Sequence, residues 1–473
     1  MGLLDRRKPQ IREKRLNTLS AYFGDVNQIL NSIEEGKIDQ KIRTFSQTSF
    51  DEIIYILQAL SGIDDAGIVI HGPLGCSAVQ LNILSKDNSN SRRWIVTNLN
   101  EKDSILGSGE KLELAIKKLY KSYKPSVVFI VATPVIAINN DDILSPLIEL
   151  EDELNIKIVP IFSDGFKSKA RIYGSDIVFH AICKYLVTNK KEETQSNLIN
   201  LISISESERE LDEIKNLLNE IGIEANILPR FSTLENINKV SKAALSISIN
   251  KDEGDYFVKS LEEKYGIPFL SNLYPIGVQG TNNWIISIAK TLGLEKNVED
   301  ILYKHSDNLK EYVNKNKLNG LRVYINLPAS KAFSVVKLIK EFEGSLAGIT
   351  VDHIDNLNKE DLIYIQNLDE NIKFHVADGQ PFEEESILNR LNPDLYIGLS
   401  HHSVLAAKLG ISSVAVDNLD ILGFNGVRNF IKIINKAIKN KKFVEKLAKA
   451  DKLPYNKNWY NRSTNWYIKQ EVK

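Results

Sequence analysis

The chain has 473 residues, more than one hydrophobic core normally organises, so two to four domains are expected. Hydrophobic residues make up 43% and charged residues 26%, the usual composition of a soluble globular protein. The 60 basic residues stand against 61 acidic ones, and this balance excludes the global positive field that favours nucleic acid or an anionic membrane. Proteins and small molecules are therefore the expected partners.

The sequence also indicates a compartment. The first ten residues lack the apolar core and the cleavage site of a secretory signal, and no later stretch is apolar for the length of a membrane span. Cys76 and Cys183 are the two cysteines, and they have no obvious pairing, which fits a reducing environment. We expect a cytoplasmic protein.

Patterns of helix and strand alternate from the start of the chain. Strands that alternate with helices at this spacing predict βαβ units and a parallel sheet, because parallel neighbours need a crossover element. Helical spacing of apolar residues covers 18–36, 49–61, 111–123, 142–154 and 175–186, and strand patterns cover 68–71, 126–132 and 157–161.

The alternation of helix and strand patterns restarts twice after a polar stretch at 189–196, and this stretch is the best candidate for a linker. The later strand patterns cover 198–204, 224–228, 245–249, 321–326, 372–375, 394–397 and 414–416. We predict three doubly wound α/β domains with parallel, Rossmann-like sheets. Their ranges are 1–195, 196–320 and 321–419, and residues 420–473 are expected to complete the N-terminal domain.

The strand pattern that ends at His71 leads into a Gly-Pro-x-Gly turn that presents Cys76. Glycine in such a turn, here Gly75, permits close approach of the backbone to a bound group, and a thiolate there would be stabilised by backbone N–H donors or by a metal. The alternative is a small apolar residue in a packed core, which is how a free cysteine near a strand end usually behaves. The residues alone leave the two interpretations about equal.

Other candidate residues give weaker evidence of a functional role. His401 and His402 could bind a metal or move protons, but adjacent residues at a helix start point in different directions. Asp141 and Asp142 fit the start of a helix, and Cys183 has the spacing of a buried helical residue. The sequence has no G-x-x-x-x-G-K-[ST] phosphate loop, so ATP hydrolysis by this chain is not expected.

Several of these segments together resemble the nitrogenase component 1 superfamily. The segment 65–76 is similar to the turn that carries a cluster ligand in that family. Further similarity is found at 97–103, 107–112, 140–143, 162–166, 261–268 and 423–426. The resemblance implies the family's three-domain α/β fold over most of the chain.

Departures from the family pattern limit what the resemblance implies. Members usually supply about three cysteines per chain to an interface cluster, whereas this chain has Gln47–Phe50 and Thr133-Pro134 at the other two positions. Hydroxyl groups are poor iron ligands beside thiolates. The positions that hold the nitrogenase active-site cofactor fall at Asn250 and Leu422, so no cofactor of that type is expected.

The resemblance predicts one subunit of a nitrogenase-like oxidoreductase complex. Cys76 would ligate a [4Fe-4S] cluster shared with a second component 1-like subunit or a copy of this chain, with Gly75 and His71 beside it in the cofactor site. An ATP-dependent iron-sulfur reductase would deliver electrons to the complex. The first alternative is a metal-free structural or assembly-scaffold subunit, and the second is a metal-independent enzyme that binds a nucleotide or sugar nucleotide.

Overall fold

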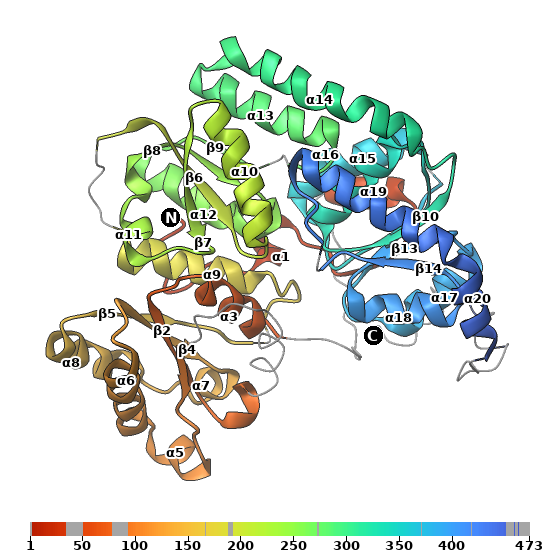
Figure 1. Cartoon of the computed structure of the whole chain (residues 1–473). Coiled ribbons are helices and arrows are strands. Elements are labelled where there is room, and N and C mark those ends of the chain that lie inside the picture. Colours follow the sequence, from red (N-terminus) through yellow and green to blue (C-terminus); the bar gives the residue numbers. More distant parts are fainter. Residues whose placement is uncertain are drawn as a thin grey trace. The chain divides into compact units, whose positions relative to one another are not determined.

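The computed structural model describes residues 2–34, 51–77, 93–165, 167–187, 193–271, 274–369, 371–417, 419–450, 458 and 462. The chain divides into two compact units (Figure 1). The first unit comprises 1–11, 50–208 and 222–271, and the second comprises 12–49, 209–221 and 272–473. No helix in the described ranges has the length and apolar character needed to cross a lipid bilayer.

The first unit begins with a four-stranded parallel sheet in the order β3-β2-β4-β5. Its strands are β2 (Ala66–His71), β3 (Trp94–Val96), β4 (Val127–Ala132) and β5 (Lys157–Ile161). Every residue of β2 and β4 is buried, as in a sheet covered on both faces. The covering helices are α3 (Ile53–Ser61), α5 (Glu101–Leu106), α6 (Gly109–Tyr123), α7 (Pro134–Asn139), α8 (Leu144–Leu154) and α9 (Tyr173–Ala181), which continues as a π-helical turn (Ile182–Leu186).

A second parallel sheet follows in the order β7-β6-β8-β9. Its strands are β6 (Gln195–Ser203), β7 (Glu224–Pro229), β8 (Ala243–Ser248) and β9 (Phe269–Leu270), and α11 (Leu234–Asn238) and α12 (Lys251–Tyr265) belong to the same unit. Residues 209–221, most of α10 (Glu208–Glu220), group with the second unit.

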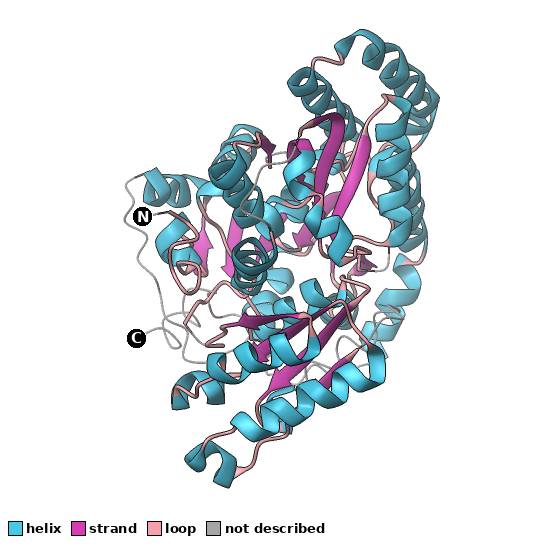
Figure 2. Cartoon of the chain, turned by 90° about the vertical axis from the view of Figure 1, so that its left-hand side faces the viewer, coloured by secondary structure: helices cyan, strands magenta, loops and turns pink. Residues whose placement is uncertain are grey.

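The second unit is built on six strands in the order β1-β12-β11-β10-β13-β14. They are β1 (Ala21–Gly24), β10 (Arg322–Asn326), β11 (Ser345–Val351), β12 (Lys373–Ala377), β13 (Leu395–Gly398) and β14 (Ser412–Ala415), and only β1 runs antiparallel to its neighbour. The helices are α1 (Arg12–Leu16), α2 (Val26–Glu34), α13 (Val278–Leu292), α14 (Val298–Lys315), α15 (Ala329–Glu341), α16 (Lys359–Leu368), α17 (Pro381–Leu391), α18 (Ser400–Lys408), α19 (Gly423–Lys439) and α20 (Lys441–Ala450). Figure 2 shows helices on both faces of the sheets.

These sheets confirm the predicted α/β class with parallel, Rossmann-like units. The helix predicted over 18–36 is wrong in its first part, because β1 pairs with β12 there through Ala21 and Ala377. The short strand β3 and the strand β11 carried no prediction. Part of the predicted linker at 189–196 lies outside the described residues, and its last two residues already belong to β6.

The domain ranges remain a prediction, and the C-terminal helices bear on one part of it. We expected residues 420–473 to complete the N-terminal domain. Within the second unit, α19 packs on β14 and on α13 and α14, with Phe430, Ile431 and Ile434 fully buried. The apolar face of α19 is therefore used inside that unit.

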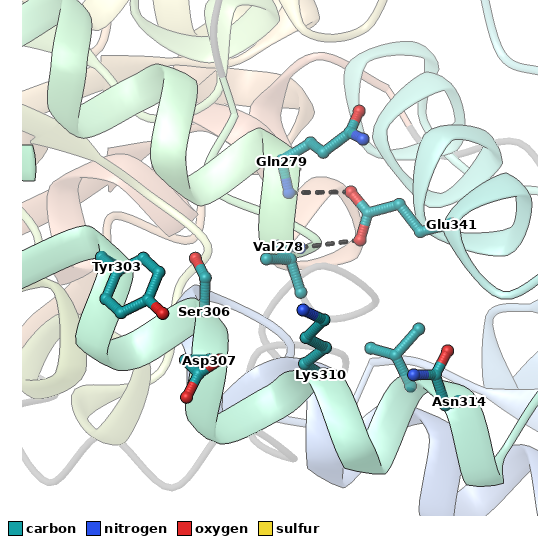
Figure 3. Close-up of a pocket in the computed structure, with 9 residues that line it drawn as sticks. Val278, Gln279, Tyr303, Ser306, Asp307, Lys310, Asn314 and Glu341 are labelled. Atoms are coloured by element: carbon teal, nitrogen blue, oxygen red, sulfur yellow. Dashed lines mark hydrogen bonds between the residues drawn. The ribbon is translucent and has the colours of Figure 1, made fainter.

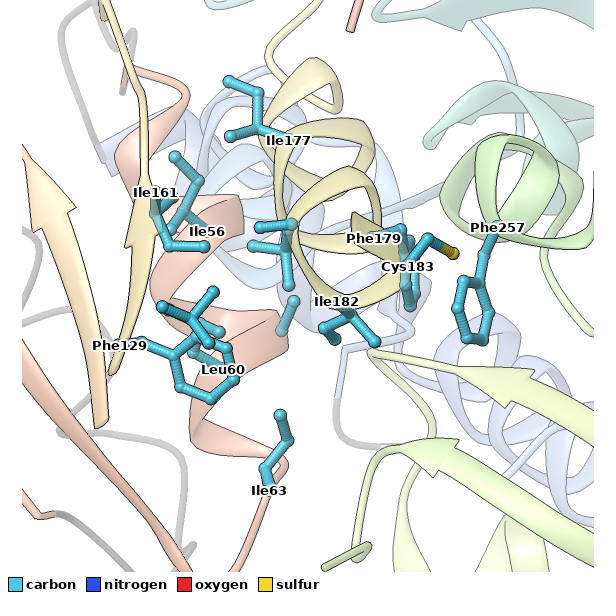
Figure 4. Close-up of a cluster of buried hydrophobic side chains, with 14 of the residues drawn as sticks. Ile56, Leu60, Ile63, Phe129, Ile161, Ile177, Phe179, Ile182, Cys183 and Phe257 are labelled. Carbon is cyan, nitrogen blue, oxygen red and sulfur yellow. The ribbon is translucent and has the colours of Figure 1, made fainter. Parts of the chain in front are cut away.

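The core of the first unit joins the helices α3, α9 and α12 to one face of the first sheet (Figure 4). Phe179 of α9 stacks on Phe257 of α12 with ring centroids 4.7 Å apart. Cys183 lies in this core with no exposed surface, which confirms the prediction that it is a packing residue. Burial raises the pKa of its thiol to about 12, so it stays neutral.

Close packing between α9 and the start of α3 depends on Gly174. A Cβ atom at this position would lie 2.2 Å from the carbonyl oxygen of Glu52 and 3.0 Å from Cβ of Tyr55. We expect Gly174→Ala to lower the free energy of unfolding by about 2–3 kcal/mol, because backbone has to move to admit the methyl group. Urea denaturation measures this, and Gly109→Ala is the control because its Cβ would meet only Pro146 at 3.7 Å. Equal stability of the two variants would contradict the packing argument.

Candidate functional site

The turn that presents Cys76 lies at the carboxyl edge of the first sheet. Strand β2 ends at His71, and a helical turn begins at 74–77, where the N–H of Cys76 donates to the carbonyl of Pro73 at 3.2 Å. Cys76 is partly exposed, Leu74 is 53% exposed, and a Cβ at Gly75 would meet nothing within 4 Å. Loops at the carboxyl edge of a parallel sheet line the crevice where ligands bind. The thiol is therefore accessible in this unit, unlike that of Cys183.

Thr133, which follows β4, fixes the start of this turn. Its hydroxyl donates to the carbonyl of His71 at 2.9 Å, and its side chain fills the space beside Gly72. A Cβ at Gly72 would lie 2.0 Å from Oγ1 of Thr133, so only glycine fits there. Thr133 stands at one of the two expected ligand positions. It is fully buried and its hydroxyl is committed to the backbone, so it acts in packing.

His71 is buried, with both ring nitrogens in hydrogen bonds. Nδ1 lies 3.1 Å from Oγ1 of Thr97, and Nε2 lies 2.9 Å from Oγ of Ser108. Ser108 donates to the carboxylate of Asp141, so its single proton is used there. A ring proton on Nε2 satisfies the contact with Ser108, and Thr97 then donates to Nδ1 and not to the carbonyl of Gly72, which its hydroxyl approaches at 3.3 Å. The tautomer is assigned from this network.

The network makes His71 a neutral residue that positions the turn. Burial lowers the pKa of its imidazole to about 4, and the carboxylate of Asp141 opposes this only in part. Thr97 receives the N–H of Gly72 at 2.9 Å and so links the ring to the first residue of the turn. With both nitrogens engaged, the ring offers no free lone pair to a metal. The expected place of His71 in the cofactor site is therefore better explained as support of the turn than as direct ligation.

Sequence reasoning missed a second support for this edge, the carboxylate of Glu52. Its Oε1 accepts hydrogen bonds from the hydroxyl of Ser163 at 2.7 Å and from the N–H groups of Gly165 and Asp164 at 2.8 and 3.0 Å. Glu52 is 3% exposed, and burial raises its pKa in spite of these donors. Pro134, next to Thr133, packs on Gly165, where a Cβ would lie 2.4 Å away. The loops after β4 and β5 are thus held together.

Among the described residues, no cation lowers the pKa of the Cys76 thiol. Burial raises its pKa, and the carboxylate of Asp51 adds to the rise. The free thiol is therefore protonated near neutral pH, and it is a poor nucleophile. Coordination to a metal ion deprotonates a thiol outright, because the ion is the largest local charge. This environment suits a metal ligand better than a catalytic nucleophile.

The remaining candidates take part in the fold. Asn250 caps α12 by accepting the N–H of Asp252 at 3.1 Å, and Leu422 is 2% exposed. Asp142 accepts the N–H of Leu144 at 2.9 Å at the start of α8, as predicted for a helix cap. The segment Gln47–Phe50 lies outside the described residues.

In the second unit, His401 and His402 lie in the first turn of α18. Nδ1 of His402 lies 3.4 Å from the carboxylate of Glu384 in α17. Burial alone would lower the pKa of His402, but Glu384 and the nearby Asp378 and Asp417 outweigh it and raise the pKa. Glu384 also accepts hydrogen bonds from Tyr396 at 2.6 Å and from Asn326. His402 thus pairs with a buried carboxylate, which favours a structural role.

Exposed apolar side chains gather on the helices that follow β3 and β4. Ile105 and Leu106 of α5 are 81% and 72% exposed, and Ile138 of α7 is 69% exposed. The two helices pack together, and the side-chain amide of Asn139 donates to the carbonyl of Ser104 at 3.2 Å. These residues follow β3 and β4, the two strands that flank β2 in the sheet, and β2 leads to Cys76. Exposed apolar side chains that form a contiguous patch can mark a site for another protein.

Comparisons with known proteins agree with this architecture. The family described as "Nitrogenase component 1 type Oxidoreductase" matches residues 56–439. The chain is 25% identical over 392 residues to the nitrogenase iron-molybdenum cofactor biosynthesis protein NifE of Methanococcus maripaludis, covering 80% of this chain and 81% of that protein. It is 27% identical to NifE of Clostridium pasteurianum over 392 residues, covering 80% of this chain and 85% of that protein.

A nitrogenase chain and a solved structure are also similar. The nitrogenase molybdenum-iron protein alpha chain of Methanococcus maripaludis is 24% identical over 407 residues, covering 80% of this chain and 83% of that protein. The solved structure titled "Nitrogenase Cp1 at pH 5" superposes with a TM-score of 0.74 at 19% identity, covering 88% of this chain and 93% of the other. The match across most of the sequence confirms the resemblance carried by the segments around Cys76, and the chain belongs to the nitrogenase component 1 type oxidoreductase family.

Proposed function

We propose that this chain is a subunit of a nitrogenase-like complex and shares a [4Fe-4S] cluster with a partner subunit through Cys76. An ATP-dependent iron-sulfur reductase would deliver electrons to that complex. The observation that carries the proposal is a partly exposed thiol on a hydrogen-bonded turn at the carboxyl edge of the first sheet. Thr133 and the His71 network hold the start of this turn, at His71 and Gly72.

The residues present fit one ligand of such a cluster and no more. A [4Fe-4S] cluster needs four ligands, usually thiolates, and when bound it supplies one-electron redox chemistry. In the described residues, Cys76 offers the single accessible thiol, and Thr133 is committed to the backbone. The other ligands would have to come from a second component 1-like subunit or a copy of this chain. The apolar side chains of Leu74, Ile105 and Ile138 support a protein partner near the thiol.

The decisive variant is Cys76→Ser in the complex purified without oxygen. We expect it to lose nearly all of the iron and acid-labile sulfide and the electron paramagnetic resonance signal of the reduced cluster, because a hydroxyl does not replace a thiolate on iron. Cys183→Ala is the matched control, since it removes the other, buried cysteine. Unchanged iron in Cys76→Ser would remove the proposal, and so would equal loss in both variants.

A metal-free scaffold subunit is the second candidate, and the structure of two positions favours it. Asn250 and Leu422, which stand where the family anchors its active-site cofactor, are buried and used in helix starts. NifE, a cofactor biosynthesis protein by its name, is among the similar proteins. Anaerobic purification of this chain with the product of a neighbouring homologous gene separates the two candidates. A colourless complex without iron would favour the scaffold, and a brown one with sulfide would favour the shared cluster.

A further inference from the structure

The second unit contains a groove of about 350 Å³ between α13, α14 and the end of α15, far along the chain from Cys76 (Figure 3). Its apolar surface comes from Val278 at the start of α13 and from Val313 and Tyr303 on α14. Tyr303 is 71% exposed although it is a large aromatic residue. The volume falls within the range of small-molecule sites, which are largely apolar with a few placed polar groups.

The walls of the groove are fixed by hydrogen bonds. The carboxylate of Glu341 accepts the N–H groups of Val278 and Gln279 at 2.8 and 2.9 Å, which ties α15 to the start of α13. Ser306 of α14 accepts from the side-chain amide of Asn282 of α13 at 3.0 Å. A preformed site of this kind loses little entropy when a ligand binds.

One stripe of α14 presents an aromatic ring, a carboxylate and an ammonium group to this groove. They belong to Tyr303, Asp307 and Lys310, which are neighbours on one helix face because they are four and three residues apart. Figure 3 shows Lys310 pointing toward Val278. Among the described residues, Asp307 and Lys310 form no ion pair and no side-chain hydrogen bond. Both charges remain available to a ligand.

The charges limit the ligand class. A phosphate or nucleotide is disfavoured, because Glu341 already occupies the N–H groups of the α13 terminus and only one cation lines the groove. A ligand ammonium group would form an ion pair with Asp307 and a cation–π contact with the ring of Tyr303. A ligand carboxylate would form an ion pair with Lys310. We propose that this groove binds an apolar α-amino acid as the zwitterion, with its side chain on Val278, Val313 and Tyr303. The site is independent of any cluster at Cys76.

Isothermal titration calorimetry on the full chain tests this with three probes. L-phenylalanine carries both charges, phenethylamine lacks the carboxylate, and N-acetyl-L-phenylalanine lacks the ammonium group. We expect saturable binding of phenylalanine and about fivefold weaker binding of each analogue, since each loses one exposed charge pair. The absence of saturable heat with phenylalanine up to its solubility limit would overturn the proposal.

Variants then test which side chain contacts each charged group of the ligand. Lys310→Met should weaken phenylalanine about fivefold and leave phenethylamine unchanged, and Asp307→Asn should weaken both while leaving the N-acetyl compound unchanged. Lys304→Met, on the same helix outside the groove, is the control and should bind as the parent does. Thermal unfolding checks that each variant is folded. If Lys310→Met and Lys304→Met bind phenylalanine equally, the groove is not the site.

Discussion

Replacing Arg12 by methionine is expected to lower the free energy of unfolding by about 3–5 kcal/mol. The guanidinium of Arg12 lies 3.0 Å from the carboxylate of Asp355 in the second unit, and neither side chain has any exposed surface. Removing the cation leaves this buried oxygen of Asp355 with the more distant imidazole of His353, whose Nε2 lies 3.9 Å away. Asp355 cannot turn to solvent without a second loss, because its other oxygen accepts the N–H of Leu357 at 2.9 Å. Hydrogen exchange of the β11 amides, measured at increasing urea concentration, gives the free energy of unfolding of this unit.

Two further variants isolate the charge from the size of the side chain. Lys14→Met makes the same substitution on the exposed side of α1 and is expected to change stability by less than about 0.5 kcal/mol. A double-mutant cycle of Arg12→Met with Asp355→Leu should recover part of the loss, because the pair is then removed together. Equal effects of Arg12→Met and Lys14→Met would contradict the buried ion pair.

The sequence predicted the parts of the fold that depend on local pattern. Strands β2 and β4 are runs of apolar residues between polar segments, and buried parallel strands have that pattern. The Gly-Pro-x-Gly turn likewise predicted that a thiol would be presented after β2. The helical pattern over 18–36 gave a wrong prediction for its first part. Four residues there form a strand that pairs with β12, more than 340 positions away along the chain. No local signal reports such a partner.

The supports of the candidate site were beyond sequence reasoning for the same physical reason. Ser108 and Asp141 lie 33 positions apart, and Glu52 lies 111 positions from Ser163. Each residue alone resembles a helix cap or a solvated acid, so its role depends on contacts that only the folded sheet creates. The sequence predicts His71 as part of the cofactor site, together with Cys76 and Gly75. Its two hydrogen bonds, which decide its role, come from Thr97 and Ser108.

The buried neutral state of His71 predicts an acid transition of the first unit. Its pKa of about 4 in the folded chain lies below the ordinary value of 6.5, so the unfolded chain binds the proton first as pH falls. The stability that this difference contributes is fully present above about pH 6.5 and is lost as pH falls toward about 4. The shift of roughly 2.5 pKa units corresponds to about 3 kcal/mol. Burial likewise lowers the pKa of His180 to about 4, so both imidazoles act in the same window.

Variants of the network separate the two imidazoles and test the direction. His71→Gln cannot take up the proton, so the stability lost between pH 6.5 and pH 4 should shrink by about 3 kcal/mol relative to the parent. At pH 7 the same variant should be less stable, because Ser108 and Thr97 lose their partners. Asp141→Asn should push the pKa of His71 lower still, since Asp141 is the group that opposes the effect of burial. Urea denaturation at a series of pH values measures all three. An unchanged pH profile in His71→Gln would show that the imidazole is not held neutral, and the turn that presents Cys76 would then need another support.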